Sequence, residues 1–186
     1  MKKLQASNKK NVYAKVDDDV FETIKEMNLK FSIQPNGYFR STAEVKFPGM
    51  MKKKRLLLHQ LVWILKTSEE PTSEVDHIDR NKSNNQFENL RLASRREQQQ
   101  HRGKLKNNTS GYSGVDHYHK VSKYKNKTYE NDYWRTSIRN QNGKLKQKYF
   151  PYNEAGKRAA GKYYDQKARE YHGEFHGELN FPDENQ

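Results

Sequence analysis

The sequence predicts an α+β protein with small antiparallel strand pairs and short helices first, then a three-stranded antiparallel sheet packed on one C-terminal helix. Hydrophobic residues make up only 32% of the 186 residues, so two or three small cores are expected rather than one large core. Short segments of alternating polar and apolar residues are separated by turn signals, which is typical of antiparallel sheets. One long segment near the C-terminus repeats small residues at every fourth position, which predicts a helix lying close against a sheet.

The N-terminal part, residues 11–55, is predicted to form short strands around one small helix. The segment DDDVFETIKEMN begins with acidic residues that suit a helix N-terminus, and it follows the alternating stretch NVYAKV. FSIQPNGYFRSTAEVKF predicts a hairpin that turns at residues 35–37. MKKKRLLLH favours a further strand, and HQLVWILK a short buried helix. Turn formers without periodicity at 103–111 predict a linker, so we expect one domain at 1–106 and a second at 107–186.

The C-terminal part is predicted to contain strands at about 112–121, 132–140 and 144–150, with a long loop at 119–131. Asn142 and Gly143 predict a tight hairpin turn between the second and third strands. That turn would place two basic rows on one sheet face, formed by Arg135, Ser137, Arg139, Lys144, Lys146 and Lys148. A helix is predicted at about 154–171, with a face toward the sheet formed by Gly156, Ala160, Tyr164 and Ala168.

The charge of the chain indicates a polyanionic partner. The formal net charge is +13 and the pI is about 9.7, which points to nucleic acid or an acidic membrane surface. There is no cysteine, which excludes disulfides and thiolate zinc sites. The apolar run LLLHQLVWIL is too short to cross a bilayer, and no signal peptide is visible, so we expect a soluble cytoplasmic protein that does not bind membranes.

The polar stretch EVDHIDRNKSNNQFENLRLASRREQQQHR, residues 74–102, predicts a site for phosphodiester hydrolysis. Asp76 and His77 are adjacent in a β-like segment, so one can hold a divalent cation while the other faces the attacking water. A helix is expected from about 95 to 102, with a capping box formed by Ser94 and Glu97. Gln98, His101 and Arg102 share one face of it and could complete a metal site and grip a phosphate. The competing interpretation is an Asx-rich turn.

With the preceding LHQLVW, the segment VDHIDRNKSNNQFENLRLAS resembles the HNH endonucleases of the homing type and their two-strand-and-helix metal finger, here at about 56–102. The resemblance implies that Asp76 binds the metal, His77 is the general base, and Asn89 positions that histidine and the finger loop. Asn84 and Asn85 match paired structural asparagines. The family has a second metal ligand, His or Asn, where this chain has Gln98, and His101 one turn later is the alternative. His59 is interpreted as a packing or finger-orienting residue.

Residues of about 111–182 resemble the DNA-binding domain of the plant apetala/ethylene-response-factor family. The likeness rests on GYSGV, WRTSIRNQNGK, YFPYNEAGKRAAGKYYD and LNFP. It implies base-facing sheet positions at Tyr118, Arg135, Ser137, Arg139, Lys144, Lys146 and Lys148, whereas an ordinary solvated sheet face is the competing interpretation. Asp116 departs from a position that is usually basic. The spacings of His117/His119 and His172/His176 are metal-like, but surface or packing roles are favoured.

Together these features predict a DNA endonuclease of the HNH homing type, as in mobile endonucleases of phages and introns. It would use one Mg²⁺ or Mn²⁺ per active site and bind double-stranded DNA through the C-terminal sheet. A monomer is favoured, and a finger with one active site should nick one strand at a time. The alternative is a non-catalytic DNA-binding transcription regulator whose finger is degenerate at Gln98. RNA binding is disfavoured because the sheet is expected to lack an exposed aromatic pair.

Overall fold

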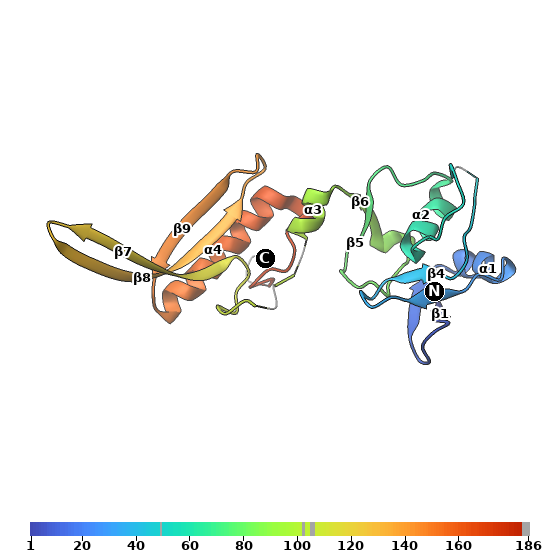
Figure 1. Ribbon diagram of the computed structural model, residues 1–186, viewed down its shortest axis with the longest axis horizontal. Helices are drawn as coiled ribbons and strands as arrows, with labels where there is room; N and C mark the ends of the chain where they lie inside the picture. Colours follow the sequence, from blue (N-terminus) through green and yellow to red (C-terminus); the bar gives the residue numbers. More distant parts are fainter. Residues whose placement is uncertain (49, 102, 105–106, 184–186) are drawn as a thin grey trace. The chain divides into compact units, whose positions relative to one another are not determined.

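The computed structural model describes residues 1–48, 50–101, 103–104 and 107–183. The chain divides into two compact units, Met1–Arg95 and Arg96–Gln186, and each is described by itself. The first contains strand pairs and helices, and the second contains a three-stranded antiparallel sheet with a long helix (Figure 1). This arrangement confirms the predicted α+β class. The assignment of separate functional domains to 1–106 and 107–186 stays a prediction.

Within the described residues, the first unit consists of three antiparallel strand pairs, two α-helices and one short 3₁₀ helix around one core. The pairs are β1 with β2, β3 with β4, and β5 with β6. The elements in chain order are β1 (Lys2–Gln5), β2 (Tyr13–Val16), α1 (Asp18–Glu26), β3 (Phe31–Ile33), β4 (Phe39–Ser41), α2 (Leu58–Thr67), β5 (Glu74–His77), the short helix η1 (Phe87–Asn89) and β6 (Leu90–Ala93).

Helix α2 is packed into the core of the first unit. Leu58, Leu61 and Val62 are fully buried, because apolar residues recur on the helix face that meets the strands. The predicted helices α1 and α2 and the hairpin β3–β4 are confirmed. The strand expected in MKKKRLLLH is wrong, since that segment makes only isolated bridges at Lys54 and Leu57. Its run of cations offers no alternating apolar face for a strand to bury.

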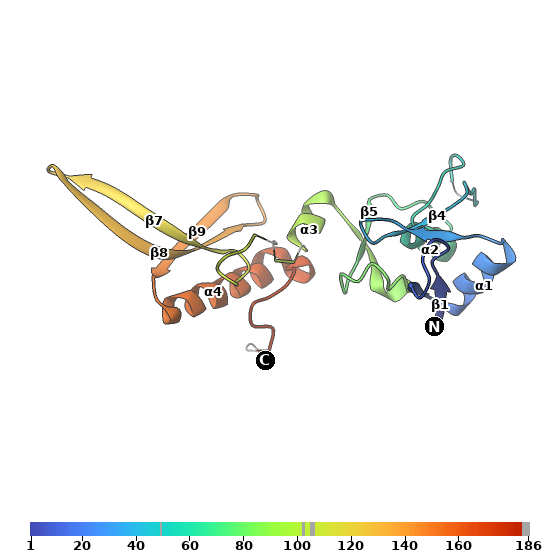
Figure 2. The same ribbon diagram turned by 60° about the horizontal axis from the view of Figure 1, so that its bottom comes forward.

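The second unit contains β7 (Val115–Tyr124), β8 (Lys127–Arg139), β9 (Leu145–Pro151), α4 (Glu154–His172) and the short helix η2 (Gly173–Phe175). Helix α3 (Arg95–Gln100) spans the division between the units. The predicted long loop at 119–131 is wrong. The chain continues as two paired strands and turns at Lys125 and Asn126, whose φ angles are +45° and +59°. Two consecutive positive φ angles make the tight turn that matches strand twist. The ribbon of β7 and β8 extends past the end of β9 (Figures 1 and 2).

Helix α4 lies close against the sheet through its small residues. Gly156, Ala160 and Ala168 are buried as predicted, and the Thr136 hydroxyl on β8 donates to the Ala160 carbonyl at 3.0 Å. A Cβ at Gly156 would lie 2.1 Å from the Pro151 carbonyl oxygen, so a larger residue there would push the helix away. The face of β8 that carries Thr136 therefore points toward α4.

The register of β8 and β9 differs from the prediction by one residue. Arg139 pairs with Leu145, Ile138 with Lys146, and Thr136 with Lys148. Because paired residues share a face, Lys146 and Lys148 lie on the α4 side, away from Arg135, Ser137 and Arg139. The single face combining this row with Lys144, Lys146 and Lys148 is therefore wrong.

Asn140 is the physical reason for this register. Its side-chain oxygen accepts from the backbone N–H groups of Asn142 and Lys144, at 3.1 and 2.9 Å. The Asn140 N–H donates to the Lys144 carbonyl at 3.0 Å, which leaves three residues in the loop, and Gly143 takes a φ of +76°. A three-residue loop ending in a left-handed glycine replaces the expected two-residue loop. One extra loop residue turns every following side chain to the opposite face.

Candidate functional site

The hairpin of β5 and β6 carries the two residues predicted to act in hydrolysis. Asp76 lies opposite Arg91, and His77 lies opposite Leu90. His77 is buried on the same side of β5 as Val75, whereas Asp76 is only partly buried on the other side. The side chains therefore point to opposite sides, as predicted. A guanidinium nitrogen of Arg91 lies 3.4 Å from the Asp76 carboxylate, within a partly buried ion pair.

His77 is held by Asn85. The ring nitrogen Nε2 lies 3.2 Å from the Asn85 side-chain oxygen, and the Asn85 amide nitrogen donates to the Lys82 carbonyl at 3.1 Å. Because the amide nitrogen is used in this way, its oxygen faces the histidine and Nε2 carries the ring proton. Nδ1 is then the nitrogen that can accept a proton. Asn85 thus orients the ring, a role that the sequence had suggested for Asn89.

Asn89 holds the loop rather than the histidine ring. Its side-chain oxygen accepts from the Asp79 N–H at 3.1 Å, and its amide donates to the Asp79 carboxylate and the Asn84 carbonyl at 2.9 and 2.8 Å. Burial raises the pKa of Asp79, but hydrogen bonds led by that from Asn84 outweigh it and hold this pKa below its usual value. The segment is therefore an Asx-rich turn as well as the connection that places Asn85.

Strand β2 also holds the loop that carries Asn85, through backbone hydrogen bonds. Lys15 donates its backbone N–H to the Ser83 carbonyl at 2.7 Å and accepts from the Asn85 N–H at 2.8 Å. Asp17, just after the strand, accepts from the Phe87 N–H at 2.9 Å. The first strands of the chain therefore act as a support for the His77 partner, although they lie far from it in sequence.

His77 belongs to a cluster of three aromatic rings. Its ring centre is 5.0 Å from that of His59 on α2 and 6.1 Å from that of Tyr38, just before β4. Tyr38 and His59 are 5.3 Å apart, and the Lys82 ammonium lies 4.4 Å from the Tyr38 ring centre. The packing role expected for His59 agrees with this geometry. Tyr38 was not recognised from the sequence, because no motif or periodicity marks it.

Both histidines are neutral at neutral pH. Burial lowers the pKa of His59 to about 3, with a further lowering by His77 and a smaller opposing effect of Asp76. Burial also lowers the pKa of His77, against the opposing hydrogen bond to Asn85 and the charges of Asp79 and Asp76. A general base must be unprotonated to accept a proton, so this environment keeps His77 in the required state.

The residues predicted to complete a metal site lie in the second unit. Gln98 is partly buried on α3 and His101 is buried just after it, whereas Asp76 belongs to the first unit. Arg102 lies outside the described residues. In the parts of the chain that the structure describes, no group of three or more His, Asp or Glu side chains could hold a metal ion. Mg²⁺ takes few protein ligands and keeps several of its waters, so the partly buried Asp76 carboxylate suits it as one ligand.

The residues predicted to contact DNA are distributed over both faces of the β7–β8–β9 sheet. Arg135 is paired with Asp116 at 2.7 Å, and its guanidinium carbon lies 4.6 Å from the Tyr118 ring centre. Ser137 accepts from Gln147 at 3.2 Å, and Arg139 donates to the Gly143 carbonyl at 2.9 Å. Lys148 lies instead over a ring of α4, with 4.4 Å between its ammonium and the Tyr163 ring centre.

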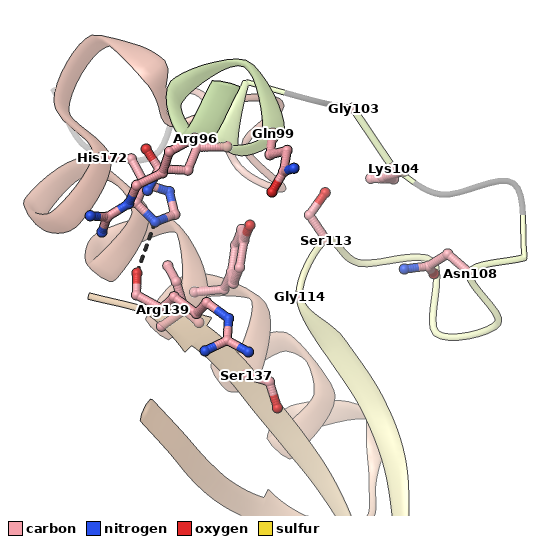
Figure 3. A pocket seen from close by; sticks show the side chains of 13 residues that line it. Arg96, Gln99, Gly103, Lys104, Asn108, Ser113, Gly114, Ser137, Arg139 and His172 are labelled. Atoms are coloured by element: carbon pink, nitrogen blue, oxygen red, sulfur yellow. Dashed lines mark hydrogen bonds between the residues drawn. The ribbon is translucent and has the colours of Figure 1, made fainter. Parts of the chain in front are cut away.

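A pocket of about 450 Å³ opens beside Ser137 and Arg139 (Figure 3). Arg96 also lines it and donates to the Asn140 carbonyl at 2.6 Å. His172 lines the pocket as well, with Nε2 3.0 Å from the Arg139 carbonyl oxygen. The pocket thus adds Arg96 to the cations at this end of the sheet.

The metal-like histidine pairs have other partners. His117 Nε2 and His119 Nδ1 lie 2.7 and 3.0 Å from one carboxylate oxygen of Asp132, and His176 bonds to the adjacent Gly177 carbonyl. These contacts agree with the surface and packing roles expected for them.

The sheet, expected from the sequence to lack an exposed aromatic pair, carries a pair of tyrosines of which one ring is exposed and the other is partly buried. The rings of Tyr118 and Tyr149 lie 5.3 Å apart on the sheet, and Tyr149 is 45% exposed.

Comparison with known protein families gives a match over the segment that contains the candidate site. Residues 56–100 match the family described as HNH endonuclease, and this segment runs from the start of α2 through β5 and β6 into α3. The match supports an HNH nuclease, and an HNH nuclease domain implies a DNA substrate. HNH nucleases generally use divalent metal ions.

No curated protein and no solved structure matches the chain. Among the described residues, no helix has both the length and the apolar character needed to span a membrane.

Proposed function

We propose that the protein is a metal-dependent DNA endonuclease of the HNH homing type, with His77 as general base and Asp76 as the residue that holds a divalent cation. The observation that carries this proposal is the neutral, buried His77, oriented by Asn85 and adjacent to Asp76 within the segment that matches HNH endonucleases. A base and a carboxylate in this arrangement meet the basic needs of phosphodiester hydrolysis.

In this mechanism the chain supplies positioning and proton transfer. His77 accepts the proton of the attacking water at Nδ1, because Asn85 engages Nε2. Asn89 keeps the loop that carries Asn85 in place. Asp76, with Gln98 or His101, would hold Mg²⁺ or Mn²⁺. When bound, the cation stabilises the charge that develops on the phosphate and the leaving oxygen.

Cleavage of supercoiled plasmid tests the proposal directly. With Mg²⁺ or Mn²⁺ the protein should produce nicked circles, because one finger carries one active site, and EDTA should stop the reaction. The competing function is a non-catalytic DNA-binding protein. It is favoured by the ion pair of Asp76 with Arg91 and by the replacement of the expected helix ligand with Gln98. Binding of plasmid without any metal-dependent nicking would establish that alternative.

The second unit would supply affinity for double-stranded DNA, in the manner of the apetala/ethylene-response-factor domains that it resembles. We assign this contact to the sheet face that carries Arg135, Ser137 and Arg139, with Gln147 between the strands. Arginine and amide side chains on a sheet can reach both phosphates and base edges in a major groove. Lys146 and Lys148 lie on the other face and are not part of this interface.

Arg139→Ala should reduce the salt dependence of duplex binding, whereas Lys148→Ala should leave it unchanged. Each lost phosphate contact lowers the slope of log affinity against log salt by about 0.9. Fluorescence anisotropy with a labelled random-sequence duplex, in EDTA to prevent cleavage, measures this slope. Lys148→Ala is a matched control because it removes the same charge from the α4 side of the sheet. An equal change in both variants would contradict the assignment of the binding face.

Gln98→His should raise cleavage at low Mg²⁺ if Gln98 is the second metal ligand. An amide oxygen is a weaker ligand than imidazole, and glutamine has an additional rotatable bond to immobilise. A metal titration of plasmid nicking gives the comparison. If His101 is the ligand instead, Gln98→His should matter little and His101→Ala should be the damaging change. Because His101 is buried, thermal melting must accompany that variant. If neither substitution alters cleavage, the second ligand lies outside α3.

A further inference from the structure

Five tyrosines of the second unit lie on one face of the sheet, the face opposite α4. Residues paired across neighbouring strands share a face, and the side chains of a strand alternate between the two faces. Tyr118 pairs with Tyr133, Tyr149 with Arg135, Tyr129 with Ser122, and Tyr124 with Lys127. The β8 residues of these pairs alternate along the strand with Thr136 and Ile138, which point toward α4, so all the paired residues lie on the opposite face. We call this surface the tyrosine face: Tyr118, Tyr124, Tyr129, Tyr133 and Tyr149.

Tyr118, Tyr133 and Tyr149 are grouped on the tyrosine face, and Tyr124 and Tyr129 lie farther along the β7–β8 ribbon. Tyr149 lies 5.3 Å from Tyr118 and 6.0 Å from Tyr133 between ring centres, and the Arg135 guanidinium covers the Tyr118 ring. Tyr149, Tyr129 and Tyr124 are 45%, 48% and 64% exposed. Several exposed aromatic rings on one sheet face therefore offer stacking surfaces to a ligand.

The charges of the ribbon are divided between its two faces. On the tyrosine face, the β7–β8 pairs place Lys120 and Lys127 beside the rings. The acidic residue of that face in the described chain is Asp116, and it is paired with Arg135 at 2.7 Å. Glu130 and Asp132 lie on the opposite face, where they contact His119. The tyrosine face is therefore the cationic face, which suits a polyanion.

We propose that the tyrosine face binds single-stranded DNA by stacking its unpaired bases on the tyrosine rings. In a duplex the flat faces of the bases are covered by neighbouring base pairs, so rings on a sheet can stack only on unpaired bases. Lys120 and Lys127 would contact the phosphates. DNA is the source of these bases because the segment that matches HNH endonucleases implies a DNA substrate. This site lies on the same sheet face as the proposed duplex contact but takes a different ligand, and it stands whether or not the chain cuts DNA.

The test uses the full chain in EDTA and fluorescein-labelled oligothymidine of about 20 nucleotides, longer than common single-strand sites. Tyr149→Leu should weaken binding by about fivefold to 150-fold, the range expected for one lost stacking partner. Tyr149→Phe keeps the ring and should bind nearly as well as the wild type. Tyr152→Leu is the matched control, because Tyr152 is also 49% exposed but stacks on Trp134 and His117 of the opposite face. It should not change affinity.

Two further ligands separate stacking from charge attraction. An abasic strand of the same length keeps the phosphates and should bind weakly, with little response to Tyr149→Leu. Duplex binding should respond much less to that substitution than oligothymidine binding, because stacked base pairs cannot lie flat on the ring. Tyr124→Leu, at the most exposed tyrosine, is a second test variant. It leaves the contacts among Tyr118, Tyr133 and Tyr149 intact. Equal losses in Tyr149→Leu and Tyr152→Leu, or abasic binding as tight as that of oligothymidine, would overturn the proposal. Tighter binding of oligouridine RNA would overturn its assignment to DNA.

Discussion

His77→Ala should abolish nicking of supercoiled plasmid while leaving the affinity for DNA nearly unchanged. A positioned general base typically contributes roughly 10²–10⁴-fold to a rate, and His77 has the neutral, oriented ring that this role requires. Nicking rates in Mg²⁺ and anisotropy in EDTA measure the two quantities separately. Cleavage at the wild-type rate would end the assignment of His77 as the base.

The burial of His77 requires a control for folding. The residue is 3% exposed and packs against His59, so alanine leaves a cavity that also costs stability. Thermal melting of His77→Ala and of His59→Ala allows this cost to be compared. If His77 is the base, His59→Ala should retain measurable nicking at temperatures where both variants are folded. Asn85→Ala should lower the rate without removing it, because the ring remains but loses the partner that fixes its tautomer.

Asp76→Asn should remove metal-dependent nicking even at high Mg²⁺. The amide keeps the size of the side chain and an oxygen beside Arg91, so the hairpin should remain folded. The loss should exceed the roughly 10–100-fold that outer partners of a metal site typically cost, because Asp76 is proposed as a direct ligand. Isothermal titration calorimetry with Mn²⁺ gives a readout that does not depend on cleavage.

Glu74→Gln is the matched control for that variant. Glu74 is a carboxylate of the same strand, its side chain is 47% exposed, and it lies near Arg95. Its replacement should leave both nicking and Mn²⁺ binding unchanged. Unchanged Mn²⁺ binding in Asp76→Asn would mean that another residue anchors the cation.

Features set by neighbouring residues could be predicted well. The spacing of Gly156, Ala160 and Ala168 is a property of one helix, and these residues are buried against the sheet as expected. The alternation of Asp76 and His77 is a property of one strand, and it too agrees with the structure. The outer part of the β7–β8 ribbon, about residues 122–131, could not be recognised as strand, since both its faces are exposed and its residues show no polar–apolar alternation.

The register of β8 and β9 could not be predicted from neighbouring residues alone. Asn142 and Gly143 correctly marked a turn, but the loop length depends on hydrogen bonds from the Asn140 side chain. A difference of one residue transferred Lys146 and Lys148 to the α4 side, because strand side chains alternate with a period of two. Because of this shift, Arg135 lies beside Tyr118 and Tyr149 and not beside the lysines of β9. The face that carries Arg135 is therefore rich in tyrosine, as the proposed single-strand site requires.

The sequence by itself determined the fold class, the nuclease-like segment and its Asp-His pair, because these depend on residue types at short, fixed spacings. Only the tertiary structure decided what surrounds His77. Tyr38, His59 and Asn85 come from separate segments, and they meet because a shared hydrophobic core and strand β2 bring β4, α2 and the Asn85 loop together. Long-range packing also excludes water from both imidazoles and thereby lowers the pKa of each. Such burial is a property of the assembled core, so no spacing within one segment could reveal it.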